Sequence, residues 1–113
     1  MSIEEKKNEL YSINKRGFGF IRGIEIKREI KDGAASTFEV SISLSDIDGN
    51  YLKLVAISCT DISIGNINNM LFASIDLIDI SSHQLEGSKY KVFDAENNLF
   101  ELTCIDILEA RGG

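Results

Sequence analysis

FEVSISLSDIDGNYLKLVAI, residues 38–57, carries the clearest structural pattern in the chain. Its first eight residues alternate apolar with polar side chains, as in a strand that buries one face. Asp48-Gly49-Asn50 then has the chemistry of a tight turn. After the turn, the run 54–57 is apolar at both odd and even positions, which is typical of a strand covered on both faces. The stretch therefore predicts two antiparallel strands, the second of them central in its sheet.

A period of two also runs through residues 18–30, on the N-terminal side of that stretch. Mostly charged side chains occupy the odd positions from Glu25 onward. The even positions are mainly apolar, with Phe18, Phe20, Ile24, Ile26 and Ile30, and are interrupted by Arg22 and Arg28. A turn at 32–36 would join this half-exposed strand to the one that begins at Phe38, so the two are expected to form a hairpin. Ahead of them, residues 3–11 predict a short helix with a thin apolar edge.

Three further strands are predicted in the C-terminal half, within residues 71–81, 90–93 and 100–107. The apolar parity changes near Leu77, which predicts a β-bulge there, and it changes again after Cys104. With about six strands and one short N-terminal helix, the fold is expected to be mainly β: a curled antiparallel sheet, a sandwich or a partly open barrel.

The length and charge of the chain set limits on its organisation and partners. Residues 1–113 are expected to form a single domain, with 1–16 as an N-terminal helix and lead-in and 109–113 as a flexible tail. With 18 acidic and 12 basic residues, the formal net charge is −6, a field that repels nucleic-acid phosphates. No secretory signal or membrane-spanning run is apparent, so a cytoplasmic protein is expected.

The residue types that carry catalysis or bind metals are sparse. Cys59 and Cys104 lie in apolar stretches and are expected to be free thiols in the core. His83 is the only histidine, and no spacing typical of a zinc site surrounds it or either cysteine. No G-x-S-x-G motif occurs, and nothing in the sequence indicates a cleft that would separate the pKa values of Asp76 and Asp79. We therefore expect no metal, no cofactor and no enzymatic activity.

RGFGFIRG, residues 16–23, raises an alternative function. Arg16 to Ile21 resembles the early strand of a cold-shock domain, which carries a Lys-Gly-Phe-Gly-Phe-Ile run. The resemblance implies a β-barrel that binds single-stranded nucleic acid. The contact residues would be Arg16, Phe18, Phe20 and Arg22.

Two features of the sequence speak against that alternative. The Trp-Phe pair and the Val-Phe-Val-His run of cold-shock domains are replaced here by Tyr11-Ser12 and by residues 37–40, so two stacking platforms are missing. Phe18 and Phe20 also share the parity of the predicted core residues of their strand. We therefore interpret both rings as interior packing groups.

The C-terminal half offers a more specific resemblance, carried by four short motifs whose order and spacing are retained. They are Ile78-Asp79-Ile80-Ser81, Gln84-Leu85-Glu86-Gly87, Tyr90-Lys91-Val92-Phe93-Asp94 and Phe100-Glu101-Leu102-Thr103-Cys104. In these motifs residues 52–108 resemble a family of small bacterial β domains that is similar to immunity-type proteins of toxin systems. The departures are Ser82, where an Asp is common, and the polar Thr103 in the last strand.

That resemblance implies a non-catalytic protein-binding domain that inhibits a toxin. Carboxylates on a rigid sheet could face the basic cleft of such a toxin, steer its approach and fix the register of binding. The candidate partner-binding residues are Asp46, Asp48, Asp61, Asp76, Asp79 and Glu86. The competing interpretation is that these acids form a solvated surface and protect edge strands.

Overall fold

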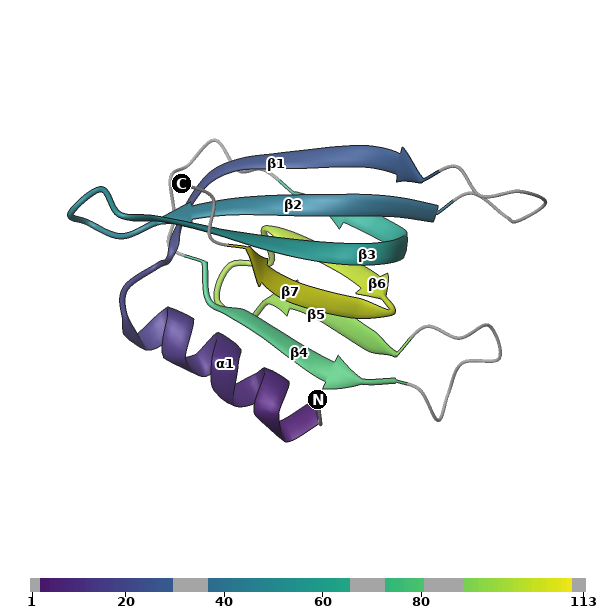
Figure 1. The fold of residues 1–113 in the computed structure, drawn as a ribbon, viewed down its shortest axis with the longest axis horizontal. Coiled ribbons are helices and arrows are strands. Elements are labelled where there is room, and N and C mark those ends of the chain that lie inside the picture. The colour runs from purple at the N-terminus through teal and green to yellow at the C-terminus, as the bar shows by residue number, and fades with distance from the viewer. Residues whose placement is uncertain (1–2, 30–36, 66–72, 81–88, 111–113) are drawn as a thin grey trace.

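The structure is a computed structural model that describes residues 3–29, 37–65, 73–80 and 89–110. The described residues form one helix and seven strands, and the strands make one antiparallel sheet that does not close (Figure 1). The elements are α1 (Ile3–Lys15), β1 (Phe20–Glu29), β2 (Thr37–Ser45), β3 (Tyr51–Ile64), β4 (Ile75–Asp79), β5 (Tyr90–Asp94), β6 (Phe100–Cys104) and β7 (Asp106–Ala110). The predicted mainly β architecture, a curled antiparallel sheet with an N-terminal helix, is confirmed.

The long strand β3 is central, as predicted, because two groups of strands share it. The sheet order is β1-β2-β3-β6-β5-β4, and β7 also pairs with β3. We call β1, β2, β7 and residues 51–57 of β3 the first half-sheet. The second half-sheet consists of β4, β5, β6 and residues 60–64 of β3. The core lies between the inner faces of these two half-sheets.

The passage from one half-sheet to the other is made by two irregular points in the backbone. In β3, Ser58 and Asp61 have positive φ angles of 53° and 50°, and the register with β6 shifts between Thr60 and Ser63. In the C-terminal strand, Ile105 separates β6 from β7, and its N–H donates to the carbonyl of Ile57 at 3.1 Å. The change of parity after Cys104 therefore marks a corner, so the predicted sixth strand is two strands.

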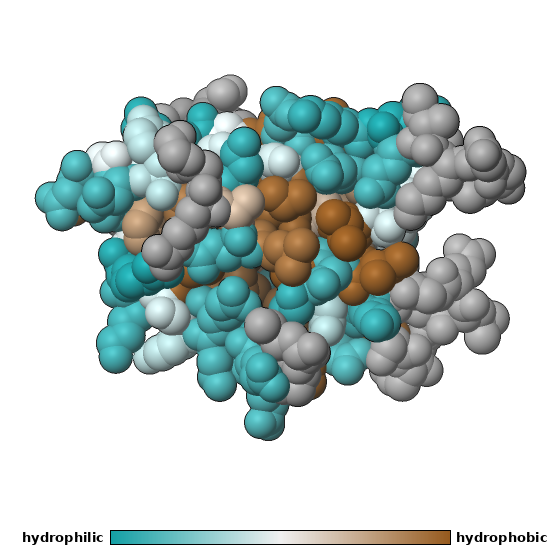
Figure 2. Space-filling view, viewed as in Figure 1, coloured by the Kyte–Doolittle hydropathy of each residue, from teal (hydrophilic) through white to brown (hydrophobic). Residues whose placement is uncertain are grey.

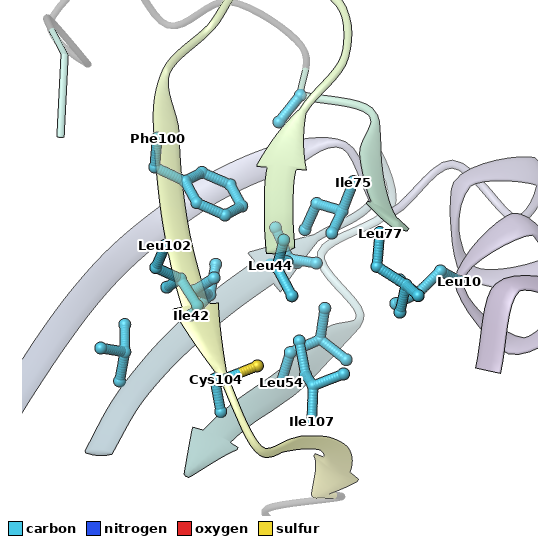
Figure 3. Close-up of a cluster of buried hydrophobic side chains, with 14 of the residues drawn as sticks. Leu10, Ile42, Leu44, Leu54, Ile75, Leu77, Phe100, Leu102, Cys104 and Ile107 are labelled. Atoms are coloured by element: carbon cyan, nitrogen blue, oxygen red, sulfur yellow. The ribbon is translucent and has the colours of Figure 1, made fainter. Parts of the chain in front are cut away.

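The core is formed by alternate side chains of both half-sheets and by one face of α1. Figure 3 shows Leu44 and Leu54 from the first half-sheet near Leu77 from the second, with Leu10 of α1 against Leu77. Burying a side chain of this size contributes roughly 1.5–3 kcal/mol. The alternation in residues 38–45 is thus explained by packing, since the even-numbered residues from Val40 onward are buried inside the curled sheet.

Helix α1 extends beyond the predicted residues 3–11 and is fixed to two strands by polar side chains. Lys6 is 5% exposed, and its ammonium donates to the carbonyl of Ile107 in β7 at 2.6 Å and pairs with Asp106 at 2.5 Å. Asn14 donates to the carbonyl of Ile75 in β4 at 2.9 Å and accepts the N–H of that residue at 3.2 Å. These contacts join α1 to both β4 and β7, and Figure 1 shows the helix alongside β4.

The turn between β5 and β6 is organised by a buried carboxylate. Asp94 is 0% exposed, and its two oxygens accept four backbone N–H groups at 2.9–3.1 Å. The donors are Ser74, Glu96, Asn97 and Leu99. A buried charge requires this kind of hydrogen bonding to offset its lost hydration. Asp94 therefore joins the start of β4 to the β5–β6 turn.

Two local predictions are wrong. The pairing of β4 with β5 is continuous from Ile75 to Asp79, so no bulge occurs at Leu77. Instead Ile78 points outward from this edge strand and is 41% exposed, which accounts for the change of parity. The expected flexible tail also begins too early, because Glu109 and Ala110 pair with β3 as part of β7.

Candidate protein-binding surfaces

Asp46 and Asp48 lie in the turn of the β2–β3 hairpin, at one end of the molecule (Figure 1). Asp46 Oδ1 accepts the N–H groups of Asp48 at 3.0 Å and of Asn50 at 2.9 Å, and Oδ2 accepts the Asn50 side-chain amide at 2.9 Å. Gly49 completes the turn with a φ of 87°, a conformation that suits glycine. The predicted tight turn is confirmed, and Asp46 is its organising residue.

The two aspartates of this turn consequently offer different chemistry to a partner. The hydrogen bond from the Asn50 side chain lowers the pKa of Asp46 below its usual value, so this carboxylate stays ionised while both its oxygens serve the turn. Asp48 is exposed next to it. A partner would therefore meet the Asp48 carboxylate more readily than that of Asp46.

Two cross-strand rows of side chains cover the outer face of the second half-sheet. Residues that pair directly across antiparallel strands point to the same face of a sheet, and the residues that alternate with these rows are buried in the core. The first row is Asp76, Phe93, Glu101 and Ser63. The second row is Ile78, Lys91, Thr103 and Thr60.

Neighbouring side chains of these rows bind one another. The Lys91 ammonium pairs with Glu101 at 2.8 Å, and the hydroxyls of Thr60 and Thr103 are 2.7 Å apart. The Asp76 carboxylate accepts the N–H of Leu77 at 2.8 Å and lies opposite the half-buried Phe93. Since Lys91 is already paired, the face combines a carboxylate with partly exposed apolar side chains.

The structure places the predicted acidic residues in separate groups. Asp76 and Asp79 share β4, at one edge of the second half-sheet, whereas the exposed Asp61 belongs to β3 at the other edge. Asp46 and Asp48 belong to the distant hairpin turn, and Glu86 lies outside the described residues. The second half-sheet thus carries three of the six candidates. Asp76 lies on its outer face, whereas Asp79 pairs with the buried Tyr90 and has the parity of the inner face.

An apolar surface that sequence reasoning missed lies on the outer face of the first half-sheet. Val55 pairs with Leu108 across β3 and β7, and both point away from the core; Leu108 is 47% exposed. Ile57 and Ile105 continue this surface, which Figure 2 shows as an apolar area over β3 and β7. The signal was the apolar run 54–57, read as a strand covered on both faces, but its second face is only half-buried.

Aromatic and basic side chains flank this apolar surface. Tyr51 is 62% exposed, its hydroxyl accepts from Arg22 at 3.4 Å, and the Arg22 guanidinium lies 5.7 Å from the centre of the tyrosine ring. Exposed Tyr and Arg are residue types enriched among those that dominate protein interfaces. The first half-sheet therefore presents a second surface suited to protein contact.

The geometry of RGFGFIRG opposes its use as a nucleic-acid surface. The Gly17 and Phe18 N–H groups donate to the carbonyls of Asn14 and Ile13 at 3.0 and 3.3 Å, and Gly17 has a φ of 88°. These bonds form the end of α1, a pattern in which glycine takes the left-handed position and the next residue packs on the helix. Phe18 is accordingly only 8% exposed, and Arg16 lies 5.3 Å from the centre of its ring.

The other aromatic candidate, Phe20, opens β1 and is half-buried opposite Ser45. Arg22 faces Tyr51 across the sheet, as described above. The interpretation of Phe18 as an interior packing group is confirmed, while Phe20 is only partly interior. Phe18 and Phe20 therefore do not offer two open rings on which successive bases could stack.

Cys59 and Cys104 are both free and fully buried, as predicted. The hydrogen bond with the Cys59 thiol, and burial, raise the pKa of Cys104 far above its usual value, so it stays a neutral thiol. Within the described part of the chain, no group of three or more His, Cys, Asp or Glu side chains could hold a metal ion, and His83 lies outside that part. The one described helix is too short to cross a membrane.

Two cavities of modest size lie at the surface of the described part of the chain. One of about 220 Å³ lies between the end of α1 and the β5–β6 turn, lined by Asn14 and Glu96 among others. Another of about 280 Å³ lies beside Ser63 and Glu101. The amide of Asn14 is already bound to the backbone of Ile75, and the other polar residues that line the first cavity are Ser74, Glu96 and Asn97.

Comparison with known proteins identifies a family that the chain matches. The family model described as Immunity protein PIM8 matches residues 2–108, which extends well beyond the C-terminal resemblance inferred from sequence motifs. No curated protein and no solved structure matches the chain. The motif Tyr-x-Val-x-Asp has a structural meaning here, because Tyr90 and Val92 are core residues and Asp94 holds the next turn.

Proposed function

The chain belongs to the Immunity protein PIM8 family, and from that premise we propose that it is a non-catalytic inhibitor that binds and neutralises a toxin. The family match over residues 2–108 carries this proposal, because it covers the helix and every strand except the last two residues of β7. An immunity-type function implies a protein partner. We further propose what kind of protein this partner is and which surface of the chain binds it.

The charge of the chain supports a basic partner. A net charge of −6 attracts a cationic surface and accelerates its association at low ionic strength. Inhibition by occlusion needs a rigid surface and no reaction chemistry, and a sheet stabilised by a common core provides such a surface. We therefore expect binding to a basic toxin to weaken as salt concentration rises.

We assign the partner-binding role first to the outer face of the second half-sheet. Asp76 presents a carboxylate from this face of the edge strand β4, beside Ile78, which is 41% exposed. Asp79 has the opposite parity and adds its charge at the exposed end of the same strand. Charged groups beside an apolar contact are the usual arrangement of an interface that gains both register and affinity. Asp61 would extend the acidic edge, and Asp48 and Glu86 remain further candidates from the sequence.

The test uses the purified product of the gene that neighbours this one. We expect the wild-type chain to bind that protein and to restore growth when the two are co-expressed. Asp76→Asn with Asp79→Asn should weaken binding about tenfold at low salt and less at high salt, because each change removes charge while it preserves shape. Titration calorimetry at two salt concentrations measures both effects.

A matched control is Glu4→Gln with Glu5→Gln, which removes the same charge from the first turn of α1. The control should bind within about twofold of the wild type, because only the net charge changes. Failure of the neighbouring gene product to bind at micromolar concentration would argue against an immunity role for this pair. If both double variants still bind tightly, the proposed immunity function stands, but the second half-sheet is not the surface that binds the partner.

A further inference from the structure

The edge strand β1 has a pattern that goes beyond the proposed function. β1 is ten residues long and ends the sheet order, with β2 as its one partner strand among the described residues. The backbone groups on the far side of an edge strand can pair with a strand from another chain. Natural proteins commonly protect such an edge with charged side chains, and β1 carries charges of both signs.

The two faces of β1 have different chemistry. Ile24 and Ile26 pair with the buried Ile42 and Val40, so they point to the inner, apolar face of the first half-sheet. Ile26 nevertheless is 44% exposed, because the inner face ends at this strand. A second strand placed beside β1 would cover it.

On the outer face, Glu25 and Lys27 pair with Ser41 and Glu39 of β2. Both side chains are more than 60% exposed, and the Lys27 ammonium lies 3.0 Å from the Glu25 carboxylate. The outer face of β1 thus offers an anion and a cation two positions apart, followed by Glu29, whose carboxylate accepts the Thr37 hydroxyl at 2.6 Å.

These positions make β1 complementary to a second copy of itself. In an antiparallel pair centred on Ile26, the side chain of Ile26 meets its own copy on the apolar face. Glu25 then lies opposite Lys27 of the second copy, and Lys27 lies opposite its Glu25. Opposite charges directly across a pair of strands are stabilising, and like charges are destabilising.

The two neighbouring registers that keep the apolar faces aligned do not pair Glu25 with Lys27 of the second copy. Centring the pair on Glu25 sets Glu25 against its own copy, and centring it on Lys27 sets Lys27 against its own copy. A strand of uniform charge from a different protein would likewise meet one like charge at either position. The charge pattern therefore favours a second copy of this chain over a basic partner strand at this edge.

We infer that two copies of the chain associate through β1, as an antiparallel, two-fold symmetric extension of the first half-sheet centred on Ile26. The association joins identical surfaces and is therefore closed at two chains. It uses an edge remote in the sheet order from β4, so it leaves the acidic face of the second half-sheet free. Because the buried area of one strand pair is small, we expect a weak dimer with a dissociation constant in the micromolar range.

Sedimentation velocity from micromolar to submillimolar concentration tests the inference. The wild-type mass should rise from 12.5 kDa toward twice that value. Glu25→Lys or Lys27→Glu alone creates two like-charge pairs by symmetry, so each should weaken the dimer about tenfold or more. The double variant Glu25→Lys with Lys27→Glu restores opposite charges and should associate within about threefold of the wild type.

Two further variants separate association from folding. Lys53→Glu makes the same charge change as Lys27→Glu on β3, away from the edge, and should leave the dimer intact. Ile26→Lys should abolish the dimer, because it puts two like charges against each other at the two-fold axis. Circular dichroism and thermal unfolding must show a folded chain for each variant.

A constant monomer mass up to submillimolar concentration would overturn the inference. The inference would also be overturned if the double variant associated as weakly as the single charge reversals, because the proposed pairing of residue 25 with residue 27 would then not contribute to association. Neither readout depends on a toxin, so this test can fail while the proposed immunity function holds, and the reverse.

Discussion

Two turns of this molecule are each organised by one aspartate, and they differ in what surrounds the carboxylate. Asp94 is fully buried between β4, β5 and β6, whereas Asp46 lies at the tip of the β2–β3 hairpin. Both accept several N–H groups at about 3 Å. The same local chemistry thus serves the core in one place and the surface in the other.

The difference teaches where a hydrogen-bonded carboxylate contributes to stability. When an exposed carboxylate is removed, water replaces it and the donors stay satisfied. When Asp94 is removed, the N–H groups of Ser74 and Leu99 lose their acceptor where water enters poorly. We therefore expect burial, and not the number of hydrogen bonds, to set the order of the following effects.

The largest effect is expected for Asp94→Ala. It should lower the free energy of unfolding by about 3–5 kcal/mol, because it removes hydrogen bonds to a charged group and leaves buried donors without an acceptor. Asp94→Asn keeps one acceptor oxygen, so it should lower the free energy of unfolding by less than Asp94→Ala does. Urea denaturation measures both, and a loss of stability for Asp94→Ala no larger than that for Asp46→Ala in the hairpin turn would contradict the comparison.

An intermediate effect is expected for Lys6→Met, which tests a buried charge whose partner is partly exposed. The change removes the bond to the Ile107 carbonyl and the ion pair with Asp106, whose side chain is 35% exposed and can regain water. The free energy of unfolding should fall by about 1–2 kcal/mol. Lys7→Met, at an exposed site of the same helix, should change it by no more than about 0.5 kcal/mol.

The smallest effect is expected at Asp46, where the sign of the pH dependence is informative. Its folded pKa is lowered, so its contribution to stability is present above the unfolded pKa and disappears as pH falls through the folded value. An NMR titration of the side-chain carboxyl should show the low pKa. Asn50→Ala should raise it, because the Asn50 side chain is the main cause of the shift.

The two core thiols provide a kinetic check on the buried region. Cys59 and Cys104 are 0% exposed, so a disulfide reagent should react with them only as fast as the protein opens. Asp94→Ala should accelerate this reaction, and Asn50→Ala at the hairpin tip should leave it close to the wild-type rate. Fast reaction of the wild type would mean that the second half-sheet opens more easily than its packing indicates.

Much of the fold could be predicted because strand patterns are local. The alternation from Val40 to Leu44 follows from one buried face, and the turn at Asp48-Gly49-Asn50 follows from its residue types. The corner at Ile105 left only a change of parity, which does not distinguish a bulge from a strand that changes partners. The same signal near Leu77 had a different cause, an exposed Ile78 on an edge strand.

The candidate surfaces were less predictable, because a side chain's role depends on distant neighbours. Gly17 and Phe18 looked like part of a nucleic-acid motif, and the structure shows them closing α1 against the core. Asp46 looked like a surface charge, and it holds its own turn. The outward apolar pair Val55 and Leu108 comes from strands 53 residues apart in sequence, so no local pattern joins them.

The sequence by itself determined the strand-rich composition, the position of the N-terminal helix, the central strand and the negative charge, since each depends on residue types and short-range spacing. The tertiary structure decided which residues are free to meet a partner. Burial and pairing across strands separated the structural Asp94 and Asp46 from the outward Asp76, because those properties arise only when distant segments pack together.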